Sequence, residues 1–501
     1  MNIREAKEQI KNTVTAYLRK DGRGQYLMEA KRQRPVFLTG APGIGKTAIM
    51  EQIAGELNIG LVSYSMIHHT RQSALGLPYI VEKTYGGNRV SVSEYTMSEI
   101  IAAVYDLMAD TGVSEGILFL DEVNCVSETL APAMLQFLQF KTFGRHALPE
   151  GWIVVTAGNP PEYNRAARRF DIVTLDRLKV MEVEPDLPAW KEYAYERGAH
   201  PAVTAYLDVR REDFCRVETT VDGVSFVTPR GWDDLSEMMK EYDLCGIPVD
   251  AALIGQYLRD RRVAKDFFAY YELYRKYEKD YSVAAIPAGT ASAEMIAKAK
   301  EAGFDERLSL VSLVIAALHA ETGAVADVET ALLLRRDALR RIGAGRKEGK
   351  TTAALLTSER EAAAKRLRSA KTASSLTKRD RAALTEAAER WRDCLADETF
   401  AAAGDEEQFR RLRDGYEEDV AALTARVEQT RDSLDNAFSF MERAFGDGSE
   451  MLIFVTELTI HRDTVAFISR YGCDKYFEHD QKLLFYDRKT ELREALAALE
   501  E

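Results

Sequence analysis

The order of apolar and polar positions divides the chain into two parts. In the first part, short apolar or β-branched runs begin at Val36, Gly60, Gly116, Trp152 and Val180. Their length and lack of polar alternation are typical of parallel strands buried on both faces. Segments with apolar residues three and four positions apart lie between them, notably 48–57, 97–108 and 128–140, and a further one covers Met1 to about Leu27. We therefore expect an α/β domain with a parallel sheet.

A second strand pattern lies between the second and third runs. Residues 78–84 and 89–95 alternate in polarity and flank Tyr85-Gly86-Gly87-Asn88, which is a turn sequence. This arrangement predicts a β-hairpin.

The second part of the chain has helical periodicity. It is expected from Pro188 to Leu258, where one helix starts near Pro229, and again from Arg261 to Tyr281, with one buried aromatic face. Helices are then predicted at 291–302, 305–322 and 325–342, before a break at Gly343-Ala344-Gly345. The apolar run at 451–460 fits a strand or a helix. Its spacing favours a buried helix that packs on the helical segment before residue 260 or on the helices after residue 290.

A coiled-coil hairpin is predicted between these helices and the C-terminal segment. In its second half apolar positions are separated by alternating steps of three and four, at Tyr416, Val420, Leu423, Val427, Thr430, Leu434, Phe438 and Met441. Residues 335–381 hold 15 Lys and Arg against 5 Asp and Glu, whereas residues 382–420 hold 5 against 12. An antiparallel hairpin would pair the basic arm with the acidic one. A nucleic-acid patch on the basic arm is the alternative.

Composition narrows the possible classes of protein. The 501 residues are 46% hydrophobic and 29% charged, which allows two or three domains with ample core. No apolar run approaches the length of a membrane span, and the first twenty residues lack a signal-peptide core, so we expect a cytoplasmic protein. The five cysteines are scattered, which argues against a disulfide framework or a zinc site. A net charge of −13 disfavours a surface that binds nucleic acid throughout.

The run at Val36 leads into a phosphate-binding loop. Its residues are Gly40, Ala41, Pro42, Gly43, Ile44, Gly45, Lys46 and Thr47, which read G-x-x-x-x-G-K-T between a strand and a helix. In this pattern backbone N–H groups surround a phosphate, the lysine reaches the terminal phosphates and the threonine hydroxyl holds Mg²⁺. ATP and Mg²⁺ are therefore the expected cofactors.

Polar residues follow two further strands. Asp121 and Glu122 end the run that begins at Gly116, and Asn159 follows the run that begins at Trp152. Carboxyl ends of parallel strands meet at one sheet edge. There Asp121 would orient a water on Mg²⁺, Glu122 would polarise the attacking water, and Asn159 would position that water without adding charge.

Arginines that could stabilise the negative charge of the transition state lie after Asn159 in the sequence. Arg177 stands just before the last strand, and a neighbouring subunit could supply it to the site. Arg165, Arg168 and Arg169 are alternatives for this role. Arg230, in Thr228-Pro229-Arg230, begins a helix from which it could reach back to the nucleotide.

These motifs together resemble the AAA+ ATPases, and within them the MoxR-like group with a helix-2 insertion. By this resemblance 40–47 are Walker A, 118–122 are Walker B, Asn159 is sensor 1, Arg177 is the trans-acting finger and Arg230 is sensor 2. The hairpin at 78–95 resembles the helix-2 insertion, and residues 141–151 resemble the pre-sensor-1 hairpin. Leu178 departs from the phenylalanine usual in that position.

The resemblance implies a division into five segments. They are an AAA+ α/β nucleotide-binding subdomain at 1–185, an α-helical lid at 186–260, a helical extension at 261–345, a helical coiled-coil hairpin at 346–445 and a helical C-terminal segment at 446–501. It also implies a ring oligomer, a hexamer, that remodels a protein client, often with a von Willebrand factor A domain partner. The alternatives are a nucleic-acid-directed AAA+ motor that uses the basic arm and a nucleotide-gated scaffold with little turnover.

Overall fold

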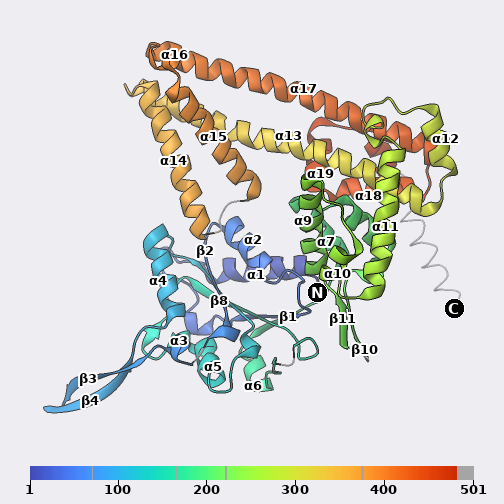
Figure 1. Ribbon diagram of the computed structural model, residues 1–501. Coiled ribbons are helices and arrows are strands. Elements are labelled where there is room, and N and C mark those ends of the chain that lie inside the picture. Colours follow the sequence, from blue (N-terminus) through green and yellow to red (C-terminus); the bar gives the residue numbers. More distant parts are fainter. Residues whose placement is uncertain (70, 165, 221–222, 374–376, 482–501) are drawn as a thin grey trace. The chain divides into compact units, whose positions relative to one another are not determined.

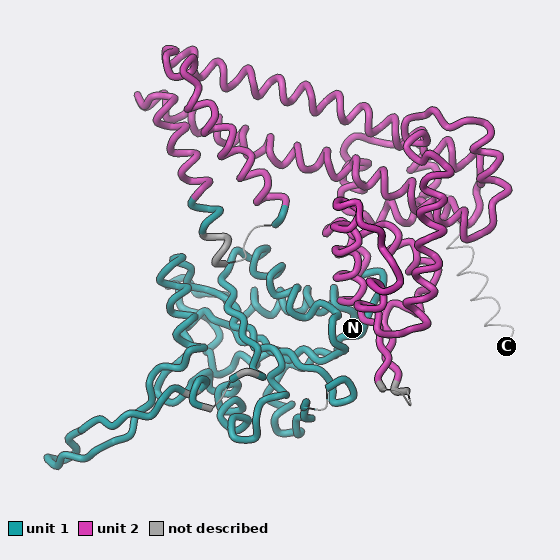
Figure 2. The backbone as a smooth tube through the Cα atoms, in the orientation of Figure 1, with its two compact units in different colours: residues 1–189, 365–378 teal, residues 190–364, 379–501 magenta. Residues whose placement is uncertain are grey.

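The chain folds into two compact units. The computed structural model describes residues 1–481 apart from 70, 165, 221–222 and 374–376. The first unit comprises residues 1–189 and 365–378, and the second comprises residues 190–364 and those from 379 onward (Figure 2). The division into five functional segments remains a prediction.

The first unit is built on a parallel sheet of five strands in the order β2-β5-β8-β1-β9. Strands β1, β2 and β8 of this sheet are labelled in Figure 1. The strands are β1 (Val36–Gly40), β2 (Gly60–Ser65), β5 (Gly116–Asp121), β8 (Trp152–Gly158) and β9 (Lys179–Val183). Each arises from one of the five apolar runs. The expected α/β fold with a parallel sheet is therefore confirmed.

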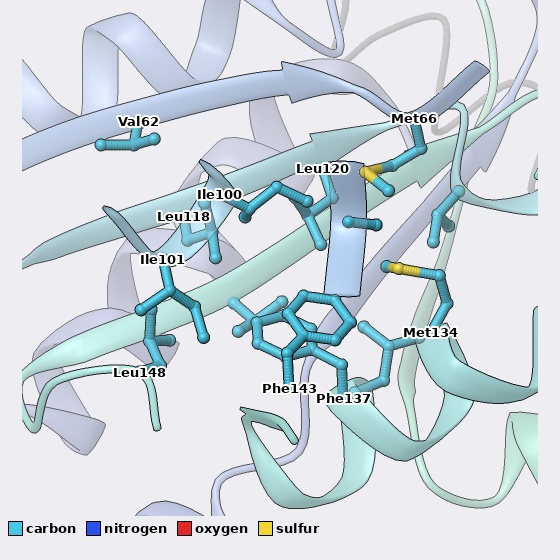
Figure 3. Packing of buried hydrophobic residues seen from close by; sticks show 14 of the residues in the cluster. Val62, Met66, Ile100, Ile101, Leu118, Leu120, Met134, Phe137, Phe143 and Leu148 are labelled. Atoms are coloured by element: carbon cyan, nitrogen blue, oxygen red, sulfur yellow. The ribbon is translucent and has the colours of Figure 1, made fainter. Parts of the chain in front are cut away.

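Apolar clusters cover the sheet on both faces. In β5, Leu118 and Leu120 face one cluster with Ile100 and Phe137, as Figure 3 shows. The alternate β5 residues, Ile117 and Phe119, belong to the other cluster, which includes Ile10 and Ile53. Side chains alternate between the faces of a strand, so a continuous apolar run is needed where both faces are covered.

Helices and short turns of the first unit surround this sheet. The α-helices are α1 (Ile3–Tyr17), α2 (Ala48–Leu57), α3 (Arg71–Leu75), α4 (Glu99–Thr111), α5 (Ala131–Phe140) and α6 (Ile172–Leu175). The 3₁₀ turns are η1 (Ala30–Arg32), η2 (Met66–His68) and η3 (Val123–Cys125).

The helix predicted to reach Leu27 ends ten residues earlier, at Tyr17. The carboxylate of Asp21 accepts hydrogen bonds from the N–H groups of Arg23 (2.8 Å) and Gln25 (3.0 Å). Gly24 adopts φ +81°, which favours glycine. Local side-chain bonding to the backbone thus replaces the helical ladder at this point.

Both small hairpins are present. β3 (Pro78–Tyr85) pairs with β4 (Asn88–Tyr95) across the two-residue turn Gly86-Gly87, in which both glycines have positive φ. This is the geometry that suits the twist of paired strands. Between α5 and β8, β6 (Thr142–Phe143) pairs with β7 (His146–Ala147). The hairpin predicted at 78–95 is confirmed, and each strand extends one residue further into the predicted turn, to Tyr85 and Asn88.

The second unit is mainly helical. Its helices are α7 (Leu187–Arg197), which begins in the first unit, α8 (Pro201–Val209), α9 (Pro229–Cys245), α10 (Ala251–Tyr257), α11 (Arg261–Asp280), α12 (Ala293–Glu301), α13 (Phe304–Lys347), α14 (Thr352–Ala373), α15 (Lys378–Ala396), α16 (Glu398–Ala401), α17 (Asp405–Phe445), α18 (Ser449–Ile460) and α19 (Arg462–Tyr471). It also contains the 3₁₀ turns η4 (Arg211–Asp213) and η5 (Val283–Ala285). The end of α14 and the first residue of α15 fall in the first unit.

One hairpin interrupts the segment expected to be helical from Pro188 to Leu258. β10 (Arg216–Thr220) pairs with β11 (Gly223–Val227) in an antiparallel ladder. Both runs contain residues that favour strands, with Val217 and Thr219 in β10 and Val224 and Val227 in β11, and this preference overrides the helical context. The helix predicted to begin near Pro229 follows directly as α9, where the Thr228 hydroxyl caps the first turn by accepting from the Gly231 N–H.

Two predicted helices and the break after them form one helix of 44 residues, α13. The expected break at Gly343-Ala344-Gly345 is wrong, because these glycines lie where other residues pack against the helix. A Cβ on Gly345 would lie 2.6 Å from a methyl group of Leu355, and one on Gly343 would lie 3.5 Å from the ring of Phe409. Glycine there permits close packing and does not end the helix.

α13 is also the one helix in the described ranges that is long and apolar enough to cross a membrane by length and composition. Of its most apolar 18-residue window, 56% is buried inside the protein. A core helix has this property too, so the finding is weak evidence for a membrane span.

Residues 451–460, which fitted a strand or a helix, lie within helix α18. Met451, Phe454, Val455 and Leu458 are buried, and both α18 and α19 pack on α13. In α17 the predicted seam is buried from Thr430 to Met441 but only partly buried or exposed from Tyr416 to Val427. The coiled coil as such stays a prediction.

Ion pairs between helices neutralise part of the positive charge of the basic arm, residues 335–381. Arg335 lies 2.5 Å from Asp419, and Arg346 lies 2.9 Å from Asp405, so α13 pairs with α17 as the charge pattern predicted. Arg379 pairs with Asp463 of α19 instead. Such pairs orient the helices more than they stabilise them where they are exposed.

A buried histidine pair lies in the core of the second unit. The rings of His319 on α13 and His461 before α19 stack with centroids 3.9 Å apart, and Tyr195 packs edge-on against both. The Tyr195 hydroxyl hydrogen-bonds to Glu457, which also pairs with Lys191. Burial lowers the pKa of His461 to about 4, and it lowers the pKa of His319 well below its ordinary value.

This pair predicts acid lability of the second unit. The unfolded chain binds a proton on each histidine near pH 6.5, whereas folded His461 stays neutral down to about pH 4. The contribution of the neutral histidines to the free energy of unfolding is therefore fully present above about pH 6.5, and it is lost as the pH is lowered toward 4. His461→Asn keeps an acceptor for the Thr464 N–H, which His461 now caps, but removes the titration. Between pH 7 and 4.5, urea unfolding should show the wild type losing about 1–3 kcal/mol more than this variant.

His146→Asn, in the partly exposed β6–β7 hairpin, is the matched control and should lose as much stability as the wild type between pH 7 and 4.5. Equal acid sensitivity of wild type and His461→Asn would contradict this account of the pair.

Candidate active site

The loop after β1 has the geometry of a phosphate cradle. Gly43 and Gly45 adopt φ of +76° and +93°, values that favour glycine. Gly40 is needed for another reason: a Cβ on it would lie 2.2 Å from the carbonyl oxygen of Val183 on β9. Ala41 and Ile44 are buried and anchor the loop, and Pro42 lies between them. The positive φ angles of Gly43 and Gly45 thus give the loop a backbone bend that suits a phosphate cradle.

Lys46 lies within this loop and is largely buried. Its ammonium group donates to the carbonyl oxygens of Gly40 (2.9 Å) and Ala41 (2.7 Å) and to Oδ1 of Asn159 (2.9 Å). The lysine and the predicted water-positioning amide are therefore in direct contact. Phosphate oxygens are the ligands that such a lysine meets in this type of loop.

Thr47 and Asp121 form a pair of hard oxygen ligands. The Thr47 hydroxyl, at the start of α2, donates to Oδ2 of Asp121 at 3.0 Å. Mg²⁺ takes few protein ligands, prefers oxygen and shares the rest of its coordination with phosphates and water. The two side chains fit this requirement, so they would hold Mg²⁺ together with a nucleotide.

Glu122 follows Asp121 in a left-handed conformation, with φ +55° and ψ +34°. Its N–H donates to Oδ1 of Asp121 at 2.8 Å, and its Oε2 accepts from the Ser65 hydroxyl at 2.7 Å. A non-glycine residue in this region is uncommon and occurs at functional sites. The turn directs Glu122 away from β5 and toward the end of β2.

Ser65 is a site residue that the sequence analysis missed. It ends β2 and lies opposite Asp121 in the parallel ladder. The signal was a serine at the end of a core strand, beside the strand that delivers the two carboxylates. The place of Ser65 beside Asp121 could be recognised only once the order of the strands was known.

The comparisons with known proteins agree with this geometry. Residues 36–177 match the ATPase family associated with various cellular activities (AAA). This segment is an AAA ATPase domain. It begins at β1 and ends at Arg177, so it contains the cradle, both carboxylates and Asn159. A search of curated proteins found no match for the chain. The AAA domain supports nucleotide binding with a divalent metal, and ATP hydrolysis in general.

The arginines of the AAA domain differ in their surroundings. Arg168 pairs with Glu128 at 2.9 Å, and Arg169 pairs with Glu162. Arg177 follows α6, is exposed and makes no ion pair with any described residue. Arg165 lies outside the described residues. Arg230 is exposed on the first turn of α9, in the second unit, so its sensor role stays a prediction.

The first unit therefore brings Lys46, Thr47, Asp121, Glu122 and Asn159 together at the carboxyl edge of one sheet. Three side-chain hydrogen bonds link them to each other or to Ser65. This is the edge at which open α/β sheets bind ligands.

Gly40→Ala should disrupt the cradle of the AAA domain. Its Cβ would collide with the backbone of β9, to which Gly40 is paired, so the two strands or the loop must move. We expect ATP affinity, measured with a fluorescent analogue, to fall at least about tenfold and stability to fall by about 1–3 kcal/mol.

Gly22→Ala is the matched control, because a Cβ there would meet no atom within 4 Å. Unchanged nucleotide affinity in Gly40→Ala would show that the cradle is not the binding site.

Proposed function

We propose that this chain is a MoxR-like AAA ATPase that hydrolyses ATP in a ring oligomer, most simply a hexamer, and remodels a protein partner. The observation that carries the hydrolytic part is the contact of Lys46, Thr47, Asp121, Glu122 and Asn159 at one sheet edge. Each has a separate task in phosphoryl transfer to water.

The role of each residue follows from where it lies in the site. The cradle N–H groups and Lys46 bind the phosphates, while Thr47 and Asp121 hold the metal ion. When bound, Mg²⁺ offsets negative charge on the phosphates. Glu122, at the end of the strand that carries Asp121, accepts a proton from the attacking water, and Ser65 fixes its orientation. Asn159 orients that water beside Lys46.

Arg177 is our choice for the finger supplied to a neighbouring subunit. Arg168 and Arg169 already have carboxylate partners. Close to Arg177, Ile172 and Val173 on α6 are 84% and 58% exposed. Apolar side chains exposed beside an arginine without an ion pair support contact of this surface with a second copy of the chain.

Arg230 is proposed as the sensor 2 residue. Pro229 starts α9 and the Thr228 hydroxyl caps it, so Arg230 projects from a well-defined helix start.

A protein client is favoured over nucleic acid because acidic residues of α17 and α19 already pair with Arg335, Arg346 and Arg379. A partner with a von Willebrand factor A domain would fit the proposed subfamily. A nucleic-acid-directed motor would show turnover stimulated by DNA or RNA, and a scaffold would show binding without turnover.

Glu122→Gln should separate binding from hydrolysis. The amide cannot accept a proton, so turnover measured by phosphate release should fall at least about hundredfold. ATP affinity should stay within about threefold, because the phosphate and metal ligands are unchanged.

Glu162→Gln, which alters an exposed carboxylate paired with Arg169, should hydrolyse ATP normally. A wild type no more active than Glu122→Gln would instead support the scaffold alternative.

Mixing two inactive variants tests whether Arg177 acts in trans. Glu122→Gln subunits keep Arg177 and Arg177→Ala subunits keep Glu122, so a shared interface can restore a complete site. An equimolar mixture that assembles at random should regain up to about a quarter of wild-type turnover, whereas each variant alone stays inactive.

Arg169→Ala is the matched control and should stay active by itself. Failure of the mixture to regain turnover, with both variants present in the same oligomers, would exclude action in trans by Arg177.

A further inference from the structure

Asn124 lies three residues after Asp121 and is 4% exposed. It belongs to the 3₁₀ turn η3, which continues the chain from Glu122. Its side-chain amide donates one hydrogen bond to the carbonyl oxygen of Asn159, at 2.8 Å, and one to that of Arg168, at 3.4 Å. The Arg168 N–H donates back to the Asn124 carbonyl at 2.9 Å.

Gly158 makes room for this side chain. A Cβ on Gly158 would lie 2.2 Å from Oδ1 of Asn124, closer than any real contact. Gly158 ends β8 and directly precedes Asn159. Gly158 thus leaves space for the Asn124 side chain, and the next residue, Asn159, accepts the hydrogen bond from that side chain.

These contacts connect three parts of the site. The turn after the two carboxylates, the end of β8 and the loop that carries Arg168 and Arg169 all meet at one buried amide. Asn159 contacts Asn124 through its backbone and Lys46 through its side chain. Fixing the backbone of Asn159 therefore determines where its amide lies relative to Lys46 and Glu122.

We propose that Asn124 is a positioning residue for hydrolysis: it holds Asn159 in register with Glu122 and makes no contact with the nucleotide. The inference rests on the proposed function, because it assigns Asn124 a role through Asn159. A buried amide that donates to two backbone carbonyls is well suited to this task, since its removal would leave two partly buried acceptors without their donor.

Asn124→Ala tests the proposal. Turnover should fall about tenfold or more, while the dissociation constant of a fluorescent ATP analogue should stay within about threefold, because Lys46, Thr47 and Asp121 are untouched. Asn124→Asp keeps the shape but loses the donor, so it should fail in the same way. In the double variant Asn124→Ala/Asn159→Ala, turnover should be no lower than in Asn159→Ala alone, since both changes act on one interaction.

Gly158→Ala provides an independent variant that leaves Asn124 in the chain. Its Cβ should displace the Asn124 side chain and reproduce the loss of turnover with retained binding. Asn436→Ala is the matched control: Asn436 also packs against a glycine, Gly289, and donates to a backbone carbonyl, that of Pro287 at 2.9 Å, but in the second unit. It should lose a similar amount of thermal stability and keep its turnover.

Two results would overturn the positioning role: wild-type turnover in both Asn124→Ala and Gly158→Ala, or a loss in the double variant that multiplies the losses of the single ones. Absence of ATP hydrolysis by the wild type, or normal hydrolysis by Asn159→Ala, would refute the proposed function itself and this inference with it. Should Asn124→Ala not fold, Gly158→Ala and its double variant with Asn159→Ala decide by the same criteria.

Discussion

The burial of a parallel sheet on both faces is the constraint on which the candidate site depends. β5 and β8 are covered above and below, so charged side chains are accommodated only where the strands end. All five strands run the same way, and their ends share one edge. The hydrogen bonds Lys46–Asn159, Thr47–Asp121 and Ser65–Glu122 each join residues that come from different strands or their loops. The core therefore determines where the chemistry can be.

Sequence patterns predicted the parallel sheet and most residues at its carboxyl edge, because strand burial and strand ends are both local signals. An apolar run followed by Asp121-Glu122, or by Asn159, can be recognised without knowing the neighbours. Ser65 and Asn124 could not be found in this way. Ser65 is recognised as a site residue only from its place opposite Asp121 in the sheet. Asn124 is recognised only from its contact with a residue 35 positions away in the sequence.

The second unit shows the same limit for secondary structure. Gly343 and Gly345 suggested a helix end, yet they are small residues at close contacts with Phe409 and Leu355. Glycine lowers helix propensity by about 1 kcal/mol, and packing of a 44-residue helix against its neighbours outweighs that cost. The β10–β11 hairpin shows the opposite case, in which a short β-branched pattern was overlooked between long helical segments.

The surroundings of the arginines favour a site that a single copy of the chain does not complete. The guanidinium groups of Arg168 and Arg169 already pair with carboxylates, whose negative charge would oppose their contact with a phosphate. Arg177 makes no ion pair with a described residue, and it stands beside the exposed apolar residues of α6. Apolar burial would supply the affinity between copies and the guanidinium would supply the charge, so assembly and hydrolysis would depend on the same surface.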